Sequence, residues 1–236
     1  MTTVALDKAH LAEAYPPPPR IPARRPWVKA NFATTPNGVI KMEGKSMGVS
    51  GPPDRKVFEF LRANCDTILV GASTARIEKY STPKPSTPEA KPPLLVVVTN
   101  SLDLDERAEF FDQHRPPLIA TSTRTAQANK ATIERISEHA NVMAFGDTSV
   151  ELSELLAHLR TQGATTLLCE GGSRLFSELL KEKLVDELCL TISPRIGNGS
   201  PTGFADIGDA APIEMTLASF FEVDNYLFCR YLINEH

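Results

Sequence analysis

The stretch TTLLCEGGSRLFSELLKEKL, residues 165–184, contains the junction that decides the fold. A short apolar run ends in a carboxylate, two glycines and a hydroxyl, and leucine and phenylalanine then recur at helical spacing. Short apolar runs indicate buried strands, so Glu170 to Ser173 are predicted to form a strand-to-helix turn. Ligands of open sheets bind at such turns, and this junction is therefore the first candidate for a site.

The same alternation of strand and helix continues on both sides of this junction. Apolar runs predict strands at 27–34, 67–71, 94–99, 117–121, 141–145 and 165–170, and periodic segments predict helices at 52–64, 123–139 and 151–163. Three strand-like runs without intervening helices follow at 186–197, 213–223 and 225–233, with a hairpin turn at VDN before Tyr226. We therefore expect an α/β fold, with a mostly parallel central sheet flanked by helices and antiparallel C-terminal strands.

Two proline-rich segments stand apart from this pattern. Residues 1–25, which include YPPPPRIPAR, are expected to form an extended N-terminal arm that precedes one folded domain at 26–236. The arm would lie on the protein itself or on a dimer mate, and the alternative is a PxxP ligand for another protein. The segment KYSTPKPSTPEAKPP, residues 79–93, is expected to be a surface loop or a flap over a site.

Composition excludes several classes of function. The chain has 236 residues, 42% hydrophobic content and a formal charge of -4, and it lacks the basic stripe of a nucleic-acid binder. No run of eighteen apolar residues and no secretory leader pattern occurs, so we expect a cytoplasmic protein that does not bind membranes. The four cysteines lack metal-ligand spacing and are predicted to be reduced core residues, and no metal site is expected.

Small and hydroxyl-bearing residues follow three of the predicted strands, at GASTAR (71–76), TNS (99–101) and EGGS (170–173). Such loops let backbone N–H groups approach an anion, and a dinucleotide across the strand ends would use all three. The TNS loop lacks the adjacent acid that binds an unphosphorylated ribose, so a 2′-phosphate would be accepted there. Each loop alone also fits a purely structural interpretation: a tight strand exit, an Asx turn, and a helix cap provided by Glu170.

The order and spacing of several motifs identify a resemblance. The chain resembles the 5-amino-6-(5-phosphoribosylamino)uracil reductases of riboflavin biosynthesis through RPWVKANFATTPNG, SGPPDRKVFEFLR, DTILVGASTAR and LLCEGGSRLFSELLKEKLVDELCLTISPRIGNG. The similarity runs from about Arg25 to about Tyr231. It implies a dihydrofolate-reductase-like fold for a reductase domain at 26–236, NADPH as cofactor and a homodimer. The zinc deaminase domain of bifunctional relatives has no counterpart in this chain.

The resemblance also implies a set of site residues. The cofactor-binding residues would be Ala33, Ser50, Gly51, Gly71, Ser73, Thr74, Arg76, Thr99, Asn100, Ser101, Gly171, Gly172, Ser173 and Arg174. Substrate would be bound by Lys29, Asn31, Arg55 and Glu170, with Arg55 or Lys29 receiving its phosphate, and the catalytic residues would be Glu170, Asn37 and Thr35. Among these, Glu170 would orient the pyrimidine, and Gly172 is expected to need a positive φ.

We therefore expect an NADPH-dependent reductase that converts the ribosyl group of a phosphorylated aminopyrimidine into a ribitylamino group. Many relatives have lysine where this chain has Asn31 and aspartate where it has Asn37, which leaves the identity of the substrate open. The alternatives are a reductase of the same fold acting on another heterocycle, such as dihydrofolate, and a non-catalytic nucleotide-binding protein.

Overall fold

The computed structural model describes residues 6–42, 44–81, 91–105, 107–111, 115–198, 205–209 and 211–234. The chain divides into two compact units: unit 1 comprises residues 1–19, 28–64 and 168–236, and unit 2 comprises residues 20–27 and 65–167. The assignment of 26–236 as one reductase domain stays a prediction. Most of the expected loop or flap at 79–93, namely 82–90, lies outside the described residues.

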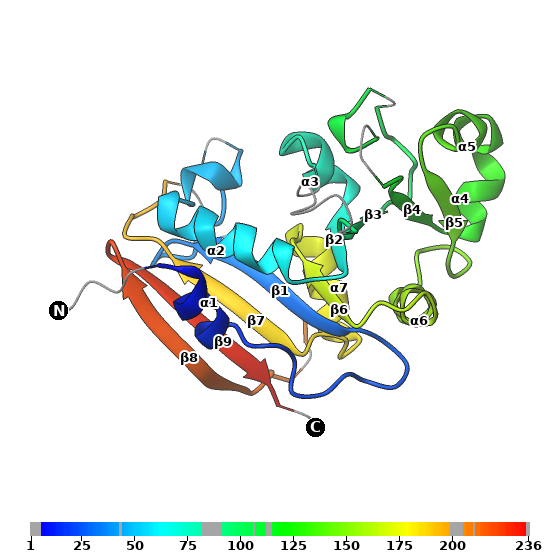
Figure 1. Cartoon of the computed structure of the whole chain (residues 1–236). Helices are drawn as coiled ribbons and strands as arrows, with labels where there is room; N and C mark the ends of the chain where they lie inside the picture. The colour runs from blue at the N-terminus through cyan, green and yellow to red at the C-terminus, as the bar shows by residue number, and fades with distance from the viewer. Residues whose placement is uncertain are drawn as a thin grey trace. The chain divides into compact units, whose positions relative to one another are not determined.

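Unit 1 is built around one end of a sheet in which β1 runs parallel to β7, and β7 and β8 each run antiparallel to β9. Figure 1 shows these strands together with α1 and α2. The elements are α1 (Lys8–Ala14), β1 (Trp27–Thr34, in this unit from Val28), η1 (Ser46–Gly48), α2 (Pro52–Ala63), α7 (Ser173–Lys181), β7 (Glu187–Ile192), β8 (Met215–Val223) and β9 (Tyr226–Ile233).

The β8–β9 hairpin turns where the sequence predicts it. Asp224 and Asn225 both have positive φ, 52° and 66°, and a two-residue turn of this kind matches the twist of the flanking strands. Asp and Asn tolerate this backbone region better than most residues. The antiparallel end of the predicted sheet is therefore confirmed, and it follows from a turn that the sequence specifies locally.

Unit 2 contains four parallel strands in the spatial order β2, β3, β4 and β5. Their bounds are β2 (Thr67–Gly71), β3 (Leu94–Val98), β4 (Leu118–Thr121) and β5 (Asn141–Ala144), and β6 (Thr166–Cys169) crosses the boundary between the units. The helices are α3 (Ala72–Ile77), η2 (Glu109–Phe111), α4 (Thr123–Ala128), α5 (Lys130–Ile136) and α6 (Leu152–Thr161). Ile68, Leu95 and Ile119 of adjacent strands have no exposed surface and pack in one core with Phe110, which explains their apolar runs.

One aspartate connects the starts of two strands of unit 2. The Asp66 carboxylate accepts hydrogen bonds from the backbone N–H groups of Thr165 and Thr166, at 2.8 and 2.9 Å, and from both threonine hydroxyls, at 2.7 and 3.1 Å. Partial burial of the carboxyl disfavours its charged form, but these bonds outweigh the burial and lower the pKa of Asp66. Asp66 is therefore a structural acid at the amino ends of β2 and β6.

The structure differs from the sequence prediction at three helices, one of which is α3, where a loop is expected at 71–76. The helix expected at 123–139 is two helices, because Asn129 leaves helical geometry and its side-chain amide donates to the Thr125 carbonyl at 2.8 Å. The N-terminal arm, expected to be extended over 1–25, contains α1, whose first turn is capped by the Asp7 carboxylate accepting from the backbone N–H of His10. Leu11 of α1 is buried, so this part of the arm packs on unit 1.

Candidate active site

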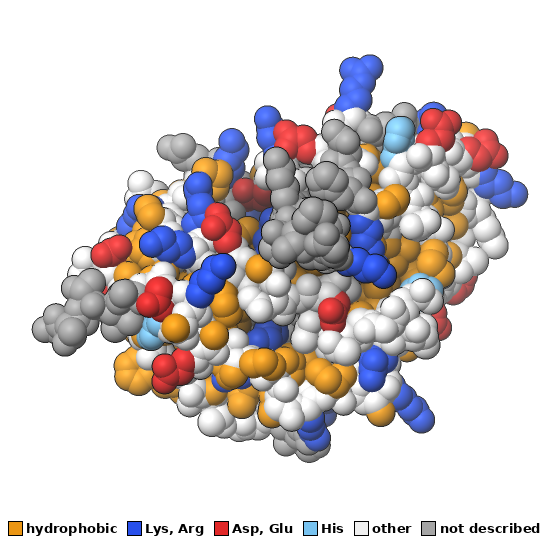
Figure 2. Space-filling view, in the orientation of Figure 1, with side chains coloured by type: hydrophobic (Ala, Val, Ile, Leu, Met, Phe, Trp, Pro, Cys, Tyr) orange, Lys and Arg blue, Asp and Glu red, His pale blue; other side chains and the backbone are white. Residues whose placement is uncertain are grey.

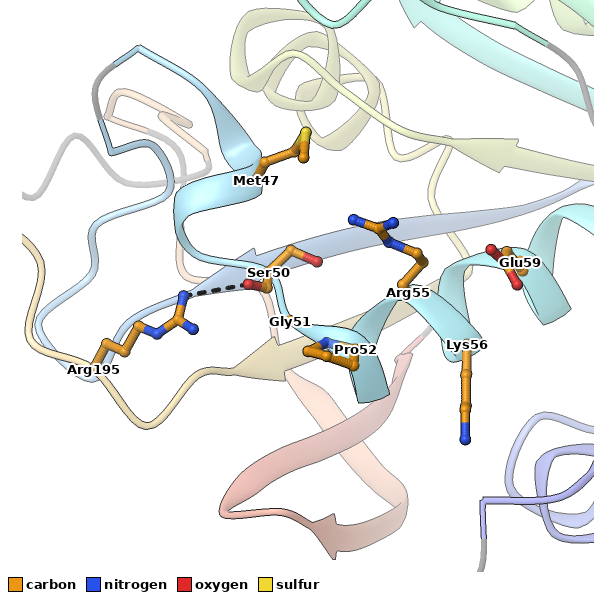
Figure 3. Close-up of a pocket in the computed structure, with 8 residues that line it drawn as sticks. All are labelled: Met47, Ser50, Gly51, Pro52, Arg55, Lys56, Glu59 and Arg195. Atoms are coloured by element: carbon orange, nitrogen blue, oxygen red, sulfur yellow. Dashed lines mark hydrogen bonds between the residues drawn. The ribbon is translucent and has the colours of Figure 1, made fainter.

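A pocket of about 500 Å³ opens in unit 1 between η1, the start of α2 and the loop after β7. Figure 3 shows its lining side chains, which are Met47, Ser50, Gly51, Pro52, Arg55, Lys56, Glu59 and Arg195. Gly51 is required by close packing, because a Cβ at this position would lie 2.1 Å from the Tyr226 hydroxyl oxygen. The predicted residues Ser50, Gly51 and Arg55 thus lie together in one cavity.

The pocket is lined by more positive than negative charge. Arg55, Lys56 and Arg195 supply three cations and Glu59 one carboxylate. Arg195 donates from one terminal nitrogen to the carbonyl oxygens of Gly48 and Ser50, at 2.7 and 3.3 Å. The Arg55 guanidinium has no hydrogen-bond or ion-pair partner within the described residues, so it is available to an anion.

A buried acid lies behind the Ser50 side of the pocket. The Ser50 hydroxyl donates a short hydrogen bond to the Asp54 carboxyl, which also bonds to the Thr191 side chain of β7. Burial raises the pKa of Asp54, and these two hydrogen bonds offset only part of that shift. Asp54 therefore keeps its proton to a higher pH than an exposed aspartate does.

Glu170 is held by an arginine of α2. Arg62 donates from its Nε and one terminal nitrogen to the two Glu170 oxygens, at 2.7 and 2.6 Å, and its guanidinium stacks over the Phe58 ring. The Glu170 side chain is 2% exposed. Helix α7 begins after Gly172 without a side-chain cap, so Glu170 does not cap it. Through Arg62, the Glu170 carboxylate instead links the end of β6 to the last turn of α2.

The double glycine has its positive φ at the first residue. Gly171 has φ 86° and a Cβ there would contact the Phe32 ring at 3.3 Å, whereas Gly172 has φ -62°. The prediction that Gly172 needs a positive φ is therefore wrong, because the backbone reverses one residue earlier. Ser173 opens α7 and Arg174 is exposed on its first turn.

The first-strand motif is stabilised by hydrogen bonds within unit 1. Thr35, 1% exposed, donates from its hydroxyl to the Asn37 side-chain oxygen at 2.7 Å. The Asn37 amide donates to the Gly197 carbonyl and its oxygen accepts from the Gly197 N–H, both at 3.0 Å. Both side chains thus fix the loop after β1 against the loop after β7. Asn31 and Ala33 are half-buried on β1.

Lys29 lies in a buried charge cluster. Its ammonium is 3.3 Å from the Glu187 carboxylate and donates to the Pro16 carbonyl at 3.2 Å, while Arg230 donates to both Glu187 oxygens at 2.8 and 3.2 Å. Lys29 and Arg230 are each 7% exposed and Glu187 is fully buried. Lys29 and Arg230 therefore share one carboxylate inside unit 1, and of the two predicted phosphate receivers only Arg55 lines the pocket.

The other predicted cofactor loops meet within unit 2. Gly71 ends β2 beside Val98 of β3, which brings 71–76 next to 99–101 at the carboxyl ends of two parallel strands. Ser73 and Thr74 lie in α3, which begins after Gly71. Several polar groups of these loops are already bonded: Arg76 pairs with Asp103 at 3.1 Å, and Asn100 accepts from the Val150 N–H at 3.0 Å.

The remaining hydroxyls of TNS are also partly used by the turn itself. The Thr99 hydroxyl oxygen accepts from the N–H groups of Ser101 and Leu102, at 3.3 and 3.0 Å, and the Ser101 hydroxyl oxygen accepts from the Asp103 N–H at 3.3 Å. The turn is therefore stabilised by the hydroxyls of Thr99 and Ser101, and not as an Asx turn, because the Asn100 side-chain oxygen accepts from Val150.

Sequence reasoning did not find Asp54, Glu59 and Arg195. Asp54 follows two prolines at a helix start and carries no motif of its own. Arg195 stands in the SPRIG segment, which belongs to a predicted strand-like run and to a motif of the family resemblance, but neither assigns a role to the arginine itself. The signal for Arg195 is its place directly beyond β7, where ligands of parallel sheets bind.

Two expected absences concern metals and membranes. The part of the chain that the structure describes has no group of three or more His, Cys, Asp or Glu side chains arranged to bind a metal ion. None of its described helices combines the length and apolarity needed to span a bilayer. The four thiols are free, and the prediction of core cysteines is confirmed for Cys169, Cys189 and Cys229, whereas Cys65 is half-buried. Burial raises the pKa of the Cys169 thiol to about 12.

A protein-family model, described as the RibD C-terminal domain, matches residues 26–228. The chain belongs to the RibD C-terminal domain family. Within it, the 2,5-diamino-6-ribosylamino-4(3H)-pyrimidinone 5′-phosphate reductase of Archaeoglobus fulgidus is 31% identical over 190 residues, covering 75% of this chain and 85% of the relative. The protein of the same name from Methanothermobacter thermautotrophicus is 29% identical over 203 residues, covering 81% and 91%.

Solved structures support the fold expected of a RibD C-terminal domain. A pyrimidine reductase-like protein from Corynebacterium diphtheriae aligns with a TM-score of 0.81 at 22% identity, covering 96% of this chain and 99% of that one. Dihydrofolate reductase from Enterococcus faecalis, complexed with NADP(H) and RAB-propyl, aligns with a TM-score of 0.52 at 20% identity, covering 89% and 97%. The predicted dihydrofolate-reductase-like α/β fold is confirmed.

Proposed function

We propose that the protein is an NADPH-dependent reductase of riboflavin biosynthesis that reduces the ribosyl group of 5-amino-6-(5-phosphoribosylamino)uracil. The observation that carries the proposal is the similarity, over most of both chains, to reductases named for a closely related ribosylaminopyrimidine phosphate. The pocket of unit 1 adds the chemistry that such a substrate needs, because an unpaired arginine faces a cavity beside Ser50.

The reaction opens the ribose ring and adds hydride. The bond between C1′ and the ring oxygen breaks as the exocyclic nitrogen forms an imine with C1′, and the ring oxygen takes up a proton. NADPH supplies the hydride that C1′ receives, which leaves the ribitylamino product and NADP⁺. The protein contributes orientation and charge, and a proton from water or from a side chain completes the balance.

The residues after β6 fit a cofactor pyrophosphate. The N-cap residue of helix α7 is Gly172, which has no side chain to accept a hydrogen bond. The first backbone N–H groups of the helix therefore have no side-chain cap. Gly171 and Gly172 carry no side chain that would block approach to them, and Ser173 adds a hydroxyl. An anion is favoured at this helix end by the aligned peptide dipoles. Segment 71–76, which is mostly helix α3, and the TNS loop at 99–101 are proposed as phosphate-binding and ribose-binding segments of unit 2.

The substrate is proposed to use two parts of unit 1. Its phosphate binds at Arg55, since Arg55 lines the pocket whereas Lys29 is buried beside Glu187. Glu170 is proposed to accept from the N–H groups of the pyrimidine, because its carboxylate stands directly after β6 and a carboxylate offers about four acceptor sites. Thr35 and Asn37 shape the nearby loop through their bonds to each other and to Gly197.

Steady-state reduction assays test the proposal. We expect NADPH oxidation with the aminouracil substrate or its 2,5-diamino counterpart, and none with dihydrofolate. The two pyrimidines are to be compared because the relatives carry the name of the diamino form. NADH should bind far more weakly than NADPH, since the residues directly after β3 are Thr99, Asn100 and Ser101 and none of them is an acid. Turnover of dihydrofolate alone, or NADPH binding without any turnover, would replace the proposal by one of the two alternatives.

We also propose a cytoplasmic homodimer. On β8, Met215, Leu217 and Phe220 expose 41%, 47% and 67% of their surface. An exposed apolar strand invites pairing with another chain, and a symmetric second copy would cover it. On the face shown in Figure 2, acidic and basic side chains are interspersed, which favours no nucleic-acid partner for that face.

A further inference from the structure

Helix α2 begins at the pocket with two prolines, which offer no backbone N–H group to an anion. Gly51 is the N-cap, and the first two helical positions are Pro52 and Pro53, which have no backbone N–H. The next residue, Asp54, has its carboxyl buried against Ser50. This helix start therefore lacks two of the amide donors that usually bind a phosphate, and side chains have to supply most of the contacts to an anion in the pocket.

Two arginines from different parts of unit 1 line the pocket and can bind an anion there. Arg55 projects from the first turn of α2 toward the cavity, and Arg195 approaches from the loop after β7 (Figure 3). Lys56, the next residue of α2, lines the same pocket, but Figure 3 shows its ammonium directed away from Arg55 and Ser50. The two guanidinium groups are thus the cations of the pocket best placed to act together.

Arg195 is fixed in place by the turn that it contacts. One terminal nitrogen donates to the carbonyls of Gly48 and Ser50, and arginine has five N–H donors in a planar fork. These bonds use one edge of the fork and leave other donors for a ligand. Because guanidinium groups bind phosphate in a bidentate manner, an arginine restrained in this way is pre-organised for a phosphate oxygen pair.

We propose that Arg55 and Arg195 together bind the phosphate monoester of a sugar phosphate, and that Arg195 also positions the Ser46–Ser50 turn that forms one wall of the pocket. The inference rests on the proposed function, because the phosphate is that of the substrate ribose. Glu59 lies one helical turn beyond Arg55, and its carboxylate weakens the attraction for a dianion at that end of the pocket.

Calorimetric titration of the full chain with ribose 5-phosphate, and with ribose, tests the proposal without any need for turnover. We expect saturable binding of ribose 5-phosphate alone. Arg55→Gln and Arg195→Gln should each raise its Kd by roughly tenfold or more, as expected for the loss of a charge-assisted hydrogen bond. Arg195→Lys keeps the charge but not the fork and should fall between wild type and Arg195→Gln.

Two variants of the same helix serve as matched controls. Lys56→Gln removes one positive charge from the neighbouring position and should change the Kd by less than about twofold, the size expected of a solvent-exposed charge. Glu59→Gln should lower the Kd, because it removes a repulsive carboxylate. A reduced dependence of log Kd on salt in Arg195→Gln would identify charge contact with the ligand, which a purely structural bond to the turn does not produce.

Several results would overturn the inference. One is wild-type protein that binds ribose 5-phosphate no better than ribose. Another is an equal loss in Lys56→Gln and Arg195→Gln, which would indicate only the general field of the surface. Weakened NADPH binding with unchanged ribose 5-phosphate binding in both arginine variants would assign the pocket to a cofactor phosphate instead. If ribose 5-phosphate binds tightly and depends on both arginines, but the protein reduces neither pyrimidine, the phosphate site formed by Arg55 and Arg195 would be supported and the proposed function refuted.

Discussion

Replacing Glu170 by glutamine should destabilise the protein far more than the loss of a helix cap would. The substitution keeps the shape of the side chain but removes the negative charge that Arg62 faces at 2.6 and 2.7 Å. The Arg62 side chain is 12% exposed and that of Glu170 2%. Removing one partner of such a buried pair leaves an uncompensated charge and costs about 3 to 5 kcal/mol, against about 1 kcal/mol for a lost cap.

Urea denaturation followed by circular dichroism measures this difference, and a double-mutant cycle assigns it to the pair. Arg62→Met keeps much of the packing over Phe58 without the charge. If the cost comes from a stranded guanidinium, the double variant Arg62→Met/Glu170→Gln should be more stable than Glu170→Gln alone. A loss below about 1 kcal/mol in Glu170→Gln, or strictly additive single effects, would refute the assignment of a buried ion pair.

The remaining predictions concern acid stability, backbone geometry and assembly. Since the pKa of Asp66 is lowered on folding, its contribution is complete above the unfolded value of about 3.9 and is lost as pH falls through the lower folded value. Urea midpoints of wild type and Asp66→Asn should therefore converge below pH 4, and parallel curves down to pH 2 would contradict this. Gly171→Ala should lower stability by about 1 to 2 kcal/mol, because alanine must adopt φ 86° and approach Phe32 at 3.3 Å, and an unchanged melting temperature would rule this out. Phe220→Asp should convert the proposed dimer into a monomer in light scattering, whereas a monomeric wild type at micromolar concentration would argue against the dimer.

Most of the sheet was predictable because its determinants are local. Runs such as Thr67–Gly71 are buried on both faces and need no partner to be identified as strands. The hairpin turn at Asp224 and Asn225 is likewise specified by residues that accept positive φ. The break at Asn129 was missed because both flanking segments keep helical periodicity, and asparagine is only a moderate helix breaker. Helix α1 had a local signal in Asp7, which was outweighed by the neighbouring prolines.

The candidate site was predictable in its residue types and less so in its contacts. Ser50, Gly51 and Arg55 were identified and lie in one pocket. The partner of Glu170 was not identifiable, because Arg62 is 108 positions away and no periodic pattern connects the two. Arg195 was missed for the same reason: its contact with Ser50 spans 145 positions. Pairing across such separations depends on the packing of whole elements, which a single sequence does not display.

The buried cluster of Lys29, Glu187 and Arg230 has an evolutionary consequence. Lys29 and Arg230 both pair with Glu187, the Pro16 carbonyl of the N-terminal segment accepts from Lys29, and the Cys189 thiol lies 3.6 Å from a Glu187 oxygen. Replacement of Glu187 alone would leave two cations without their carboxylate in the interior, whereas replacement of either cation would leave a neutral ion pair. Homologous chains are therefore expected to replace one of the two cations more readily than Glu187, and chains that keep both cations without the carboxylate should be rare.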